Sequence, residues 1–249
     1  MLVNSQYLVS CCLLFSLLGL ACDRNPTPEP ISLNLVETLA MAIDEPSGLS
    51  LSNDQLLSVS DDDNKVYRIN PTTGTVVATL NYEGDDLEGV VQNQQDNSIW
   101  IVEESRQELV KLDVNGTAQD TFAIPFTQME SNHGLEGATL DPATERLYLI
   151  TEKDPAQLLV VDFGGNILEN YALNFALDYS GISFDPSQNQ LYILSDESQT
   201  ITRCNLQGEK LETYRIDATK AEGIAVDVPN KRVYVASDLN SELYWYDLP

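Results

Sequence analysis

Carboxylates recur at two fixed positions along this chain, and their spacing is its strongest chemical signal. One position directly precedes a glycine that recurs at intervals of 41 to 48 residues, as Gly48, Gly89, Gly137, Gly181 and Gly223. The other ends a β-branched segment 13 to 15 residues after each glycine. Eight of these ten positions are acidic: Asp61, Glu88, Glu104, Glu136, Glu152, Asp196, Glu222 and Asp238. Carboxylate oxygens are the ligands that hard divalent cations such as Ca²⁺ take.

The overall charge narrows the class of partner. The 39 Asp and Glu residues outnumber 13 Lys and Arg, which gives a formal charge of -26. Such a chain is a poor partner for nucleic acid or an anionic membrane face, and a divalent cation is its natural complement. His133 is the single histidine, so zinc sites with two histidine ligands are excluded. We expect a monomer; no protein partner can be named from the sequence.

The glycine period indicates the elements that must position these carboxylates. Each glycine opens a short apolar strand, followed by a polar turn, a second strand that ends in the carboxylate, and a third strand. A period of about 40 to 45 residues is typical of a four-stranded propeller blade. The fifth repeat ends without a fourth strand, while an unassigned strand lies at residues 32–39.

We therefore predict an all-β fold, a single β-propeller of five four-stranded blades whose last blade is closed by the N-terminal strand. The alternative, six blades, requires a degenerate copy inside the 48-residue interval. An α-helix of eight to ten residues beyond residue 40 would count against either ring.

Antiparallel pairing puts the start of the first strand and the end of the second at one end of each blade. Because the innermost strands line the channel, the eight carboxylates are expected to form a ring at one channel mouth. Two carboxylates about 5 Å apart repel by roughly 3 kcal/mol at an effective dielectric of about 20, which favours a bound cation. The alternative is a structural role, in which these side chains hydrogen-bond to neighbouring loops.

Few other side chains near this mouth have distinctive chemistry. Lys153 and Lys220 lie beside the predicted ring, and His133 precedes the third glycine by four residues, so all three are possible ligand contacts. Cys204 aligns with the buried apolar position of the third strands and is expected to be an inert core residue.

The first 30 residues suggest export. Residues 1–21 carry no charged side chain, and the apolar run from Tyr7 stops at Cys22. The segment Leu18 to Cys22 resembles a lipobox, which predicts a signal peptide and lipid-anchored Cys22 over 1–22, a Pro-rich tether over 23–30 and the propeller over 31–249. The protein would then be membrane-anchored only through lipid, at the periplasmic or outer cell surface. Plain secretion and an uncleaved anchor are the alternatives.

The repeated Glu-Gly-Ile-x-x-Asp and Leu-Tyr-Ile-x-Ser-Asp units, behind this leader, resemble the SdiA-regulated family of bacterial propellers over roughly residues 31–249. The resemblance implies an exported or membrane-associated propeller that binds calcium, distantly similar to phytase-type propellers with Ca²⁺ in an acidic channel. Because repeats 1 and 4 have serine before the glycine, the ion site should be weighted toward Glu88, Glu136 and Glu222.

Three functions follow from these observations. The first is a calcium-binding propeller with a binding or sensing role at the cell envelope, without catalytic residues. The second is a calcium-dependent, phytase-like phosphoesterase, although the basic cluster that a phosphate-rich substrate needs is not evident. The third is a metal-free scaffold for protein interactions.

Overall fold

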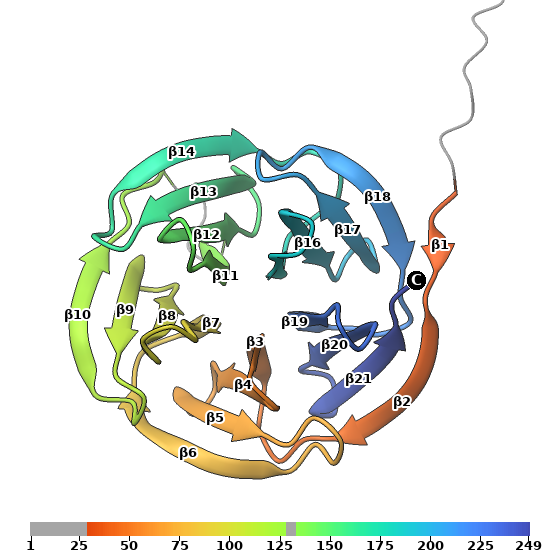
Figure 1. Ribbon diagram of the computed structural model, residues 1–249, viewed down its shortest axis with the longest axis horizontal. Coiled ribbons are helices and arrows are strands. Elements are labelled where there is room, and N and C mark those ends of the chain that lie inside the picture. Colours follow the sequence, from red (N-terminus) through yellow and green to blue (C-terminus); the bar gives the residue numbers. More distant parts are fainter. Residues whose placement is uncertain (1–28, 128–132) are drawn as a thin grey trace, which may run out of the picture.

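Five antiparallel sheets stand around a central axis like the blades of a propeller (Figure 1). The structure is a computed structural model that describes residues 29–127 and 133–249. Every regular element in these two ranges is a strand, so the prediction of an all-β fold is confirmed. None of the described residues forms a helix long and apolar enough to cross a membrane.

Each blade runs from the axis to the rim in chain order. Blade 1 contains β3 (Pro46–Ser52), β4 (Gln55–Ser60), β5 (Lys65–Ile69) and β6 (Val76–Glu83). Blade 2 contains β7 (Leu87–Gln92), β8 (Ile99–Glu103), β9 (Glu108–Leu112) and β10 (Ala118–Ala123). Blade 3 contains β11 (Leu135–Asp141), β12 (Arg146–Thr151), β13 (Gln157–Asp162) and β14 (Ile167–Ala172). Blade 4 contains β15 (Gly181–Asp185), β16 (Gln190–Ser195), β17 (Thr200–Cys204) and β18 (Lys210–Arg215). Blade 5 contains β19 (Ala221–Asp227), β20 (Arg232–Ser237) and β21 (Glu242–Asp247).

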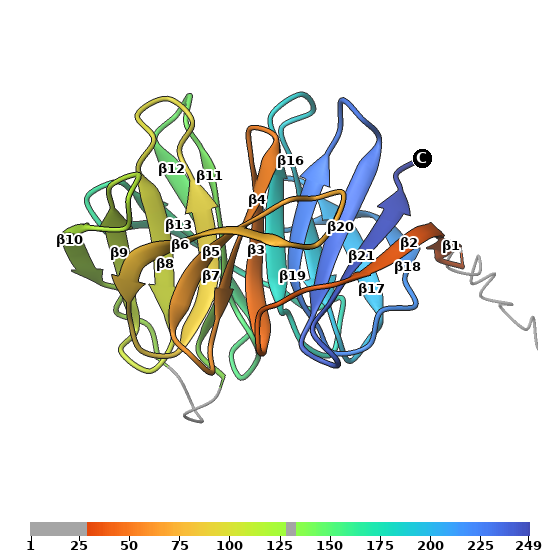
Figure 2. The ribbon, with the colours of Figure 1, turned by 90° about the horizontal axis from the view of Figure 1, so that it is seen from below.

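The N-terminal strand completes blade 5, as predicted. Strand β2 (Asn34–Ala40) pairs antiparallel with β21, with Leu39 opposite Leu243. A shorter strand, β1 (Ile31–Ser32), pairs in parallel with β18 at the rim of blade 4. Strands β1 and β2 therefore cross the boundary between two blades, and Figures 1 and 2 show both at the rim there. Five blades, not six, close the ring.

The apolar core is divided into five clusters, and each lies between two neighbouring blades. Leu57 and Val59 of blade 1, for example, pack with Leu87 and Ile99 of blade 2. The position predicted for Cys204 is confirmed: it is fully buried between blades 3 and 4, and desolvation raises the pKa of its thiol to about 12. Burial of side chains from both sheets at every boundary stabilises the ring as one unit.

The five recurring glycines lie where the inner strands converge on the axis. A Cβ atom on Gly48 would lie 2.4 Å from the carbonyl oxygen of Glu88, and one on Gly223 would lie 2.3 Å from that of Ser47. None of these glycines has a positive φ angle; the left-handed glycines are the four in the turns to the outer strands, such as Gly74 and Gly208. Close approach of neighbouring backbones, not a turn conformation, requires glycine at the axis.

Candidate metal centre

One mouth of the channel forms a hollow of about 580 Å³ that we call the acidic cup. Its lining consists of Asp61, Asp86, Glu88, Glu104, Glu136, Glu152, Asp178, Asp196, Glu197, Glu222 and Asp238, together with Ser47, Ser180, Lys153 and Lys220. All eight carboxylates predicted to meet at one mouth are present, as are both predicted lysines. The predicted ring therefore exists as geometry.

β-Bulges explain how glutamates on an inner strand turn toward the cup. In β7, Leu87 pairs with Glu103 while Gly89 pairs with Val102, so Glu88 is an extra residue in the ladder. The same shift occurs at Glu136 in β11 and at Glu222 in β19. A bulge bends its strand and changes the direction of the extra side chain. Blade 4 has no such shift, and β15 begins at its glycine.

The axis is narrow beside the cup. Along the axis, the five recurring glycines and their neighbours line a space of only about 10 Å³. A space of that size holds about one water molecule. The acidic cup is thus a wide hollow that leads down to a much narrower space along the propeller axis.

Burial and mutual repulsion make five carboxyl groups of the cup hard to ionise. Desolvation, reinforced by neighbouring carboxylates, raises the pKa of Glu104 and that of Glu222 to about 7 each, and that of Asp61 to about 6. The pKa values of Glu88 and Glu136 are also raised, first by desolvation and then by the surrounding charges. Groups with raised pKa values favour either a proton or a bound cation.

Three carboxylates form the tightest group in the cup. Asp86, Glu88 and Glu104 each offer one oxygen, and these oxygens all lie within 4.8 Å of one another. Neighbouring groups position them: the Gly134 amide donates to Glu104 Oε1 at 2.7 Å, and Ser105 Oγ donates to Asp86 Oδ2. The Glu104 amide also donates to the Asp86 carbonyl oxygen at 2.9 Å. These three residues, the blade 2 triplet, are the best candidate ligands for a metal ion.

The basic residues of the cup lie away from the blade 2 triplet. Lys153 Nζ contacts Glu152 at 2.6 Å and Glu197 at 2.9 Å, which links blades 3 and 4. Lys220 precedes β19 in blade 5 and lowers the pKa values of Glu222 and Asp238, opposing the effect of burial. Neither lysine of the cup therefore pairs with the carboxylates of Asp86, Glu88 or Glu104.

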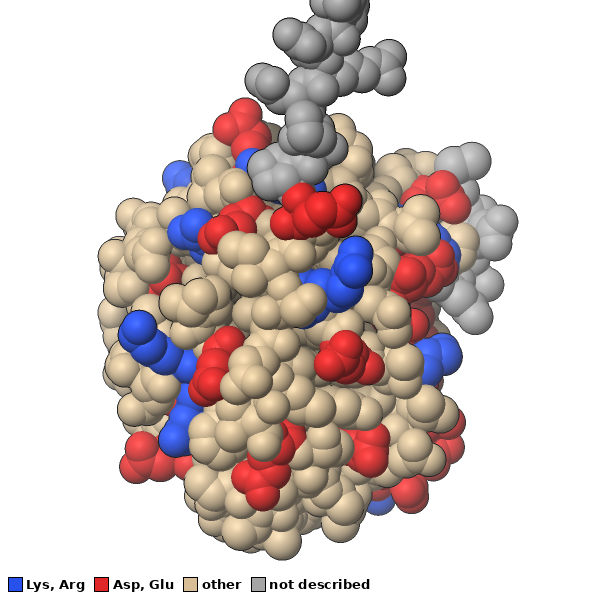
Figure 3. All heavy atoms as spheres, turned by 90° about the vertical axis from the view of Figure 1, so that its right-hand side faces the viewer, with Lys and Arg blue, Asp and Glu red and all other residues tan. Residues whose placement is uncertain are grey.

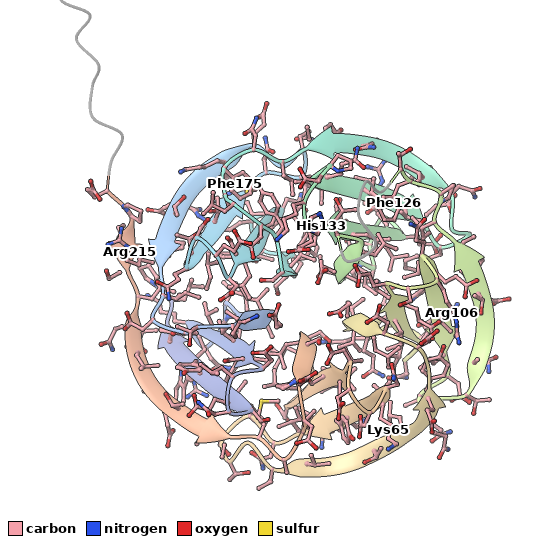
Figure 4. All side chains as sticks on the ribbon, turned by 180° about the vertical axis from the view of Figure 1, so that it is seen from behind. Lys65, Arg106, Phe126, His133, Phe175 and Arg215 are labelled. Carbon is pink, nitrogen blue, oxygen red and sulfur yellow. The ribbon has the colours of Figure 1, made fainter. Side chains whose placement is uncertain are left out.

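Other cations near this mouth point outward. Arg106 pairs with Glu103 at 2.8 Å and Asp85 at 3.3 Å, and Figure 4 shows it and Lys65 farther from the axis than His133. On the rim around β1, β2 and β18, acidic and basic side chains are interspersed (Figure 3). On this part of the rim, acidic side chains are thus mixed with basic ones.

His133 lies just before β11 but is not part of the cup lining. Its Nδ1 atom is 3.6 Å from Asp154 Oδ2, across the loop between β12 and β13. Conversely, Asp86, Asp178 and Glu197 line the cup although neither recurring position includes them. Asp86 and Asp178 share a position three residues before the recurring glycine, and that spacing is the signal that identifies them in the sequence.

Comparison with known proteins agrees with this fold. A glutaminyl cyclase of Myxococcus xanthus is similar with a TM-score of 0.68 at 12% identity, over 89% of this chain and all of that chain. Hydrazine synthase of Kuenenia stuttgartiensis matches at 0.54 and 11% identity, over 80% of this chain and 57% of that chain. A chain of a nidogen/laminin complex matches at 0.55 and 16% identity, over 77% and 72%.

Identities this low establish a shared fold alone. A family model described as SdiA-regulated, however, matches residues 32–246, which include strands of all five blades. The matched range contains all five recurring glycines. The chain belongs to the SdiA-regulated family.

Proposed function

We propose that this protein is a calcium-binding propeller with a binding or sensing role, and that Ca²⁺ binds at the blade 2 triplet. The main supporting observation is that three carboxylate oxygens lie within 4.8 Å of one another, in a cup where burial already raises the pKa values of Glu88 and Glu104. At about 4.8 Å, two such charges repel by roughly 3 kcal/mol at an effective dielectric of about 20. A divalent cation converts that repulsion into attraction.

The donor set favours calcium among the common metals. All three ligands are oxygens, and the cup has room for the waters that complete a shell of six to eight. Oxygen-to-oxygen spans of up to 4.8 Å fit across a shell whose metal–oxygen distances are about 2.3–2.6 Å. Zinc prefers nitrogen and sulfur ligands, and neither His133 nor Cys204 lines the cup.

A binding role agrees better with the cup than hydrolysis does. A calcium-dependent phosphoesterase needs cations to hold the phosphate oxygens, and Lys153 is already paired with two carboxylates. Lys220 remains the one lysine of the cup without a carboxylate within 4.0 Å in the described part of the chain. The phosphoesterase is therefore the second candidate, with Lys220 as its phosphate contact.

Calorimetry and melting experiments on residues 31–249 separate these functions. We expect Ca²⁺ to bind at micromolar to millimolar concentration and to raise the melting temperature, and a chelator to reverse both effects. A melting temperature that changes neither with Ca²⁺ nor with chelator would contradict calcium binding and favour the metal-free scaffold. The phosphoesterase would be favoured if the protein hydrolysed a phosphomonoester and if this activity were abolished both by chelation and by Glu88→Gln.

Replacement of Gly134 tests the geometry of the triplet without changing a ligand. A Cβ atom at Gly134 would lie 2.4 Å from Glu104 Cγ, so Gly134→Ala must displace the Glu104 side chain. We expect Ca²⁺ affinity to fall about tenfold, the loss of roughly one charge-assisted contact. Gly164→Ala is the matched control, because its Cβ atom would approach only Asn166 and Asp162 side chains in a turn of blade 3. Equal affinities of the two variants would contradict the assignment.

We further propose that the propeller is anchored at the cell envelope through lipid on Cys22. Residues 1–28 lie outside the described part of the chain, so support comes from the apolar run that stops at Cys22 and the Pro-rich segment that follows. Cys22→Ser is expected to move the protein from the membrane fraction to the soluble fraction. Mass spectrometry that finds Cys22 without lipid in the wild-type protein would contradict the anchor.

A further inference from the structure

A second cavity lies between blades 1 and 2 and has no part in the acidic cup. It has a volume of about 470 Å³ and is open to solvent. Four asparagines, Gln92, Thr79 and Arg68 supply its polar lining, so we call it the amide pocket. Its asparagines include Asn53 in the β3–β4 turn and Asn97 in the β7–β8 turn. These turns join first to second strands and lie at the end of the ring opposite the cup (Figure 2).

Arg68, on β5, is a half-buried cation with no carboxylate within 4.0 Å among residues 29–127 and 133–249. Within the described part of the chain its guanidinium makes one hydrogen bond, from Nη1 to Gln92 Oε1 at 3.3 Å, which leaves four of its five N–H donors for solvent or a ligand. Desolvation lowers its pKa, whereas carboxylates raise the pKa values of Arg106 and Arg203. In a chain with 39 acidic residues, a half-buried arginine without a carboxylate is unusual.

Hydrogen bonds hold the residues that line the amide pocket beside Arg68 in place. Gln92 is 5% exposed; it accepts a hydrogen bond from Ser52 Oγ and donates one from Nε2 to the Asn97 carbonyl oxygen at 3.1 Å. The Asn81 amide donates to the Asn115 carbonyl oxygen at 3.0 Å, which joins β6 to the β9–β10 turn of the next blade. The amide pocket is thus a built feature of the boundary between two blades.

The other four blades show what blade 1 lacks. At the equivalent step of each ladder, the outer strand places an acidic residue opposite the third strand: Asp120 opposite Lys111, Glu169 opposite Val160, Glu212 opposite Arg203, and Glu37 opposite Trp245. In blade 4 this produces an ion pair of 2.8 Å between Arg203 and Glu212. In blade 1 the residue opposite Arg68 is Ala78, which also lines the amide pocket.

We propose that the amide pocket binds a small carboxylate that carries several hydroxyl groups, the chemistry of an acidic monosaccharide. The ligand's carboxylate takes the place beside Arg68 that Glu212 takes beside Arg203, because a guanidinium binds a carboxylate through paired N–H donors. Side-chain amides both donate and accept hydrogen bonds, so Asn53, Asn81 and Asn97 suit neighbouring hydroxyl groups. The volume falls within the range of small-molecule sites.

Two substitutions test the proposal from opposite directions, with D-glucuronate as the probe and a chelator present so that Ca²⁺ has no influence. Arg68→Gln removes the cation, and Ala78→Glu supplies the missing carboxylate from the protein itself. We expect calorimetry or ligand-detected NMR to give millimolar binding to the wild-type protein and at least a tenfold loss in both variants. Ala78→Glu should also melt at or above the wild-type temperature, since its acidic side chain recreates the pairing of blade 4.

Arg203→Gln is the matched control, because it removes an arginine at the same ladder position in blade 4 and should leave glucuronate binding unchanged. D-glucose, which lacks the carboxylate, should bind at least tenfold more weakly than glucuronate. Binding that survives Arg68→Gln, equal binding of glucose, tighter binding of inorganic phosphate, or no glucuronate binding by the wild-type protein would each overturn the proposal.

Discussion

In a buffer that contains a chelator, the protein is expected to lose thermal stability as the pH rises from about 5 to about 8. The cause is the group of cup carboxyls whose pKa values are higher in the folded protein than in the unfolded chain. Glu104 and Glu222 shift from an ordinary 4.5 to about 7, and Asp61 shifts from 3.8 to about 6, chiefly through desolvation. The folded protein therefore binds more protons than the unfolded chain between about pH 4 and pH 7.

The direction of the effect follows from proton linkage. The free energy of unfolding falls with rising pH wherever the folded state holds more protons. The stabilisation from these carboxyls is complete below about pH 4 and is lost as the pH passes through 6 and 7. Other carboxyls act in the opposite sense, because hydrogen bonds from Tyr67 and Ser98 outweigh desolvation and lower the pKa values of Asp63 and Asp96. Maximum stability is therefore expected near pH 5.

The loss between pH 5 and pH 8 should be about 3 kcal/mol, after allowance for screening by water and salt in the open cup. For a propeller of this size, that corresponds to a fall of about 6 to 12 °C in melting temperature. Circular dichroism at a series of pH values measures it. Saturating Ca²⁺ should reduce this dependence of the melting temperature on pH, because the ion stabilises the ionised carboxylates of the cup. A melting temperature that rises steadily from pH 5 to pH 8 without Ca²⁺ would contradict the raised pKa values.

The triple variant Asp86→Asn, Glu88→Gln and Glu104→Gln is expected to lose calcium binding and yet melt higher than the wild-type protein in chelator. The substitutions remove all three close ligands, so affinity should fall by at least a hundredfold. They also remove the repulsion within the blade 2 triplet, whose oxygens lie within 4.8 Å of one another. Without the ion, stability at pH 8 should therefore rise by about 2 kcal/mol.

A second triple variant separates this local effect from a change in net charge. Asp54→Asn, Glu83→Gln and Glu145→Gln remove the same number of charges from exposed positions outside the cup. We expect this control to bind Ca²⁺ like the wild-type protein and to melt within about 2 °C of it. Calorimetry and melting in chelator give both results. If the blade 2 variant still bound Ca²⁺, the ion site would have to be reassigned to another part of the cup, at Glu136 and Glu222.

The repeats predicted the fold because their spacing is set by blade geometry. Each repeat has the expected third strand, and the carboxylates that end the second strands directly follow β4, β8, β12, β16 and β20. The N-terminal strand was expected over 32–39, but the backbone breaks at Leu33 into β1 and β2. Leu33 is buried among residues of blades 4 and 5, a tertiary contact that local periodicity does not encode.

The site was predictable as a ring but not in its detail. Periodicity placed eight carboxylates at one mouth, and the bulges that turn Glu88, Glu136 and Glu222 toward the cup become apparent only from the pairing register. Asp86, the third member of the triplet, lies just before β7 in a left-handed backbone conformation with a φ angle of 61°, so strand periodicity does not predict its place. The amide pocket was also missed, because its signal is the absence of an acidic residue at Ala78, and that absence has meaning only once the ladders are aligned.

The pairing of β2 with β21 sets the order in which the molecule can mature. Residues 34–40 are among the first of the propeller to be synthesised, yet their partner, residues 242–247, comes last. Throughout synthesis, β2 has no partner and the growing chain ends in an open sheet edge, the kind of surface on which aggregation and proteolysis begin. An interrupted chain therefore lacks both the closing sheet and the boundary between blades 5 and 1. Resistance to proteases is therefore expected to appear only once β21 has paired with β2.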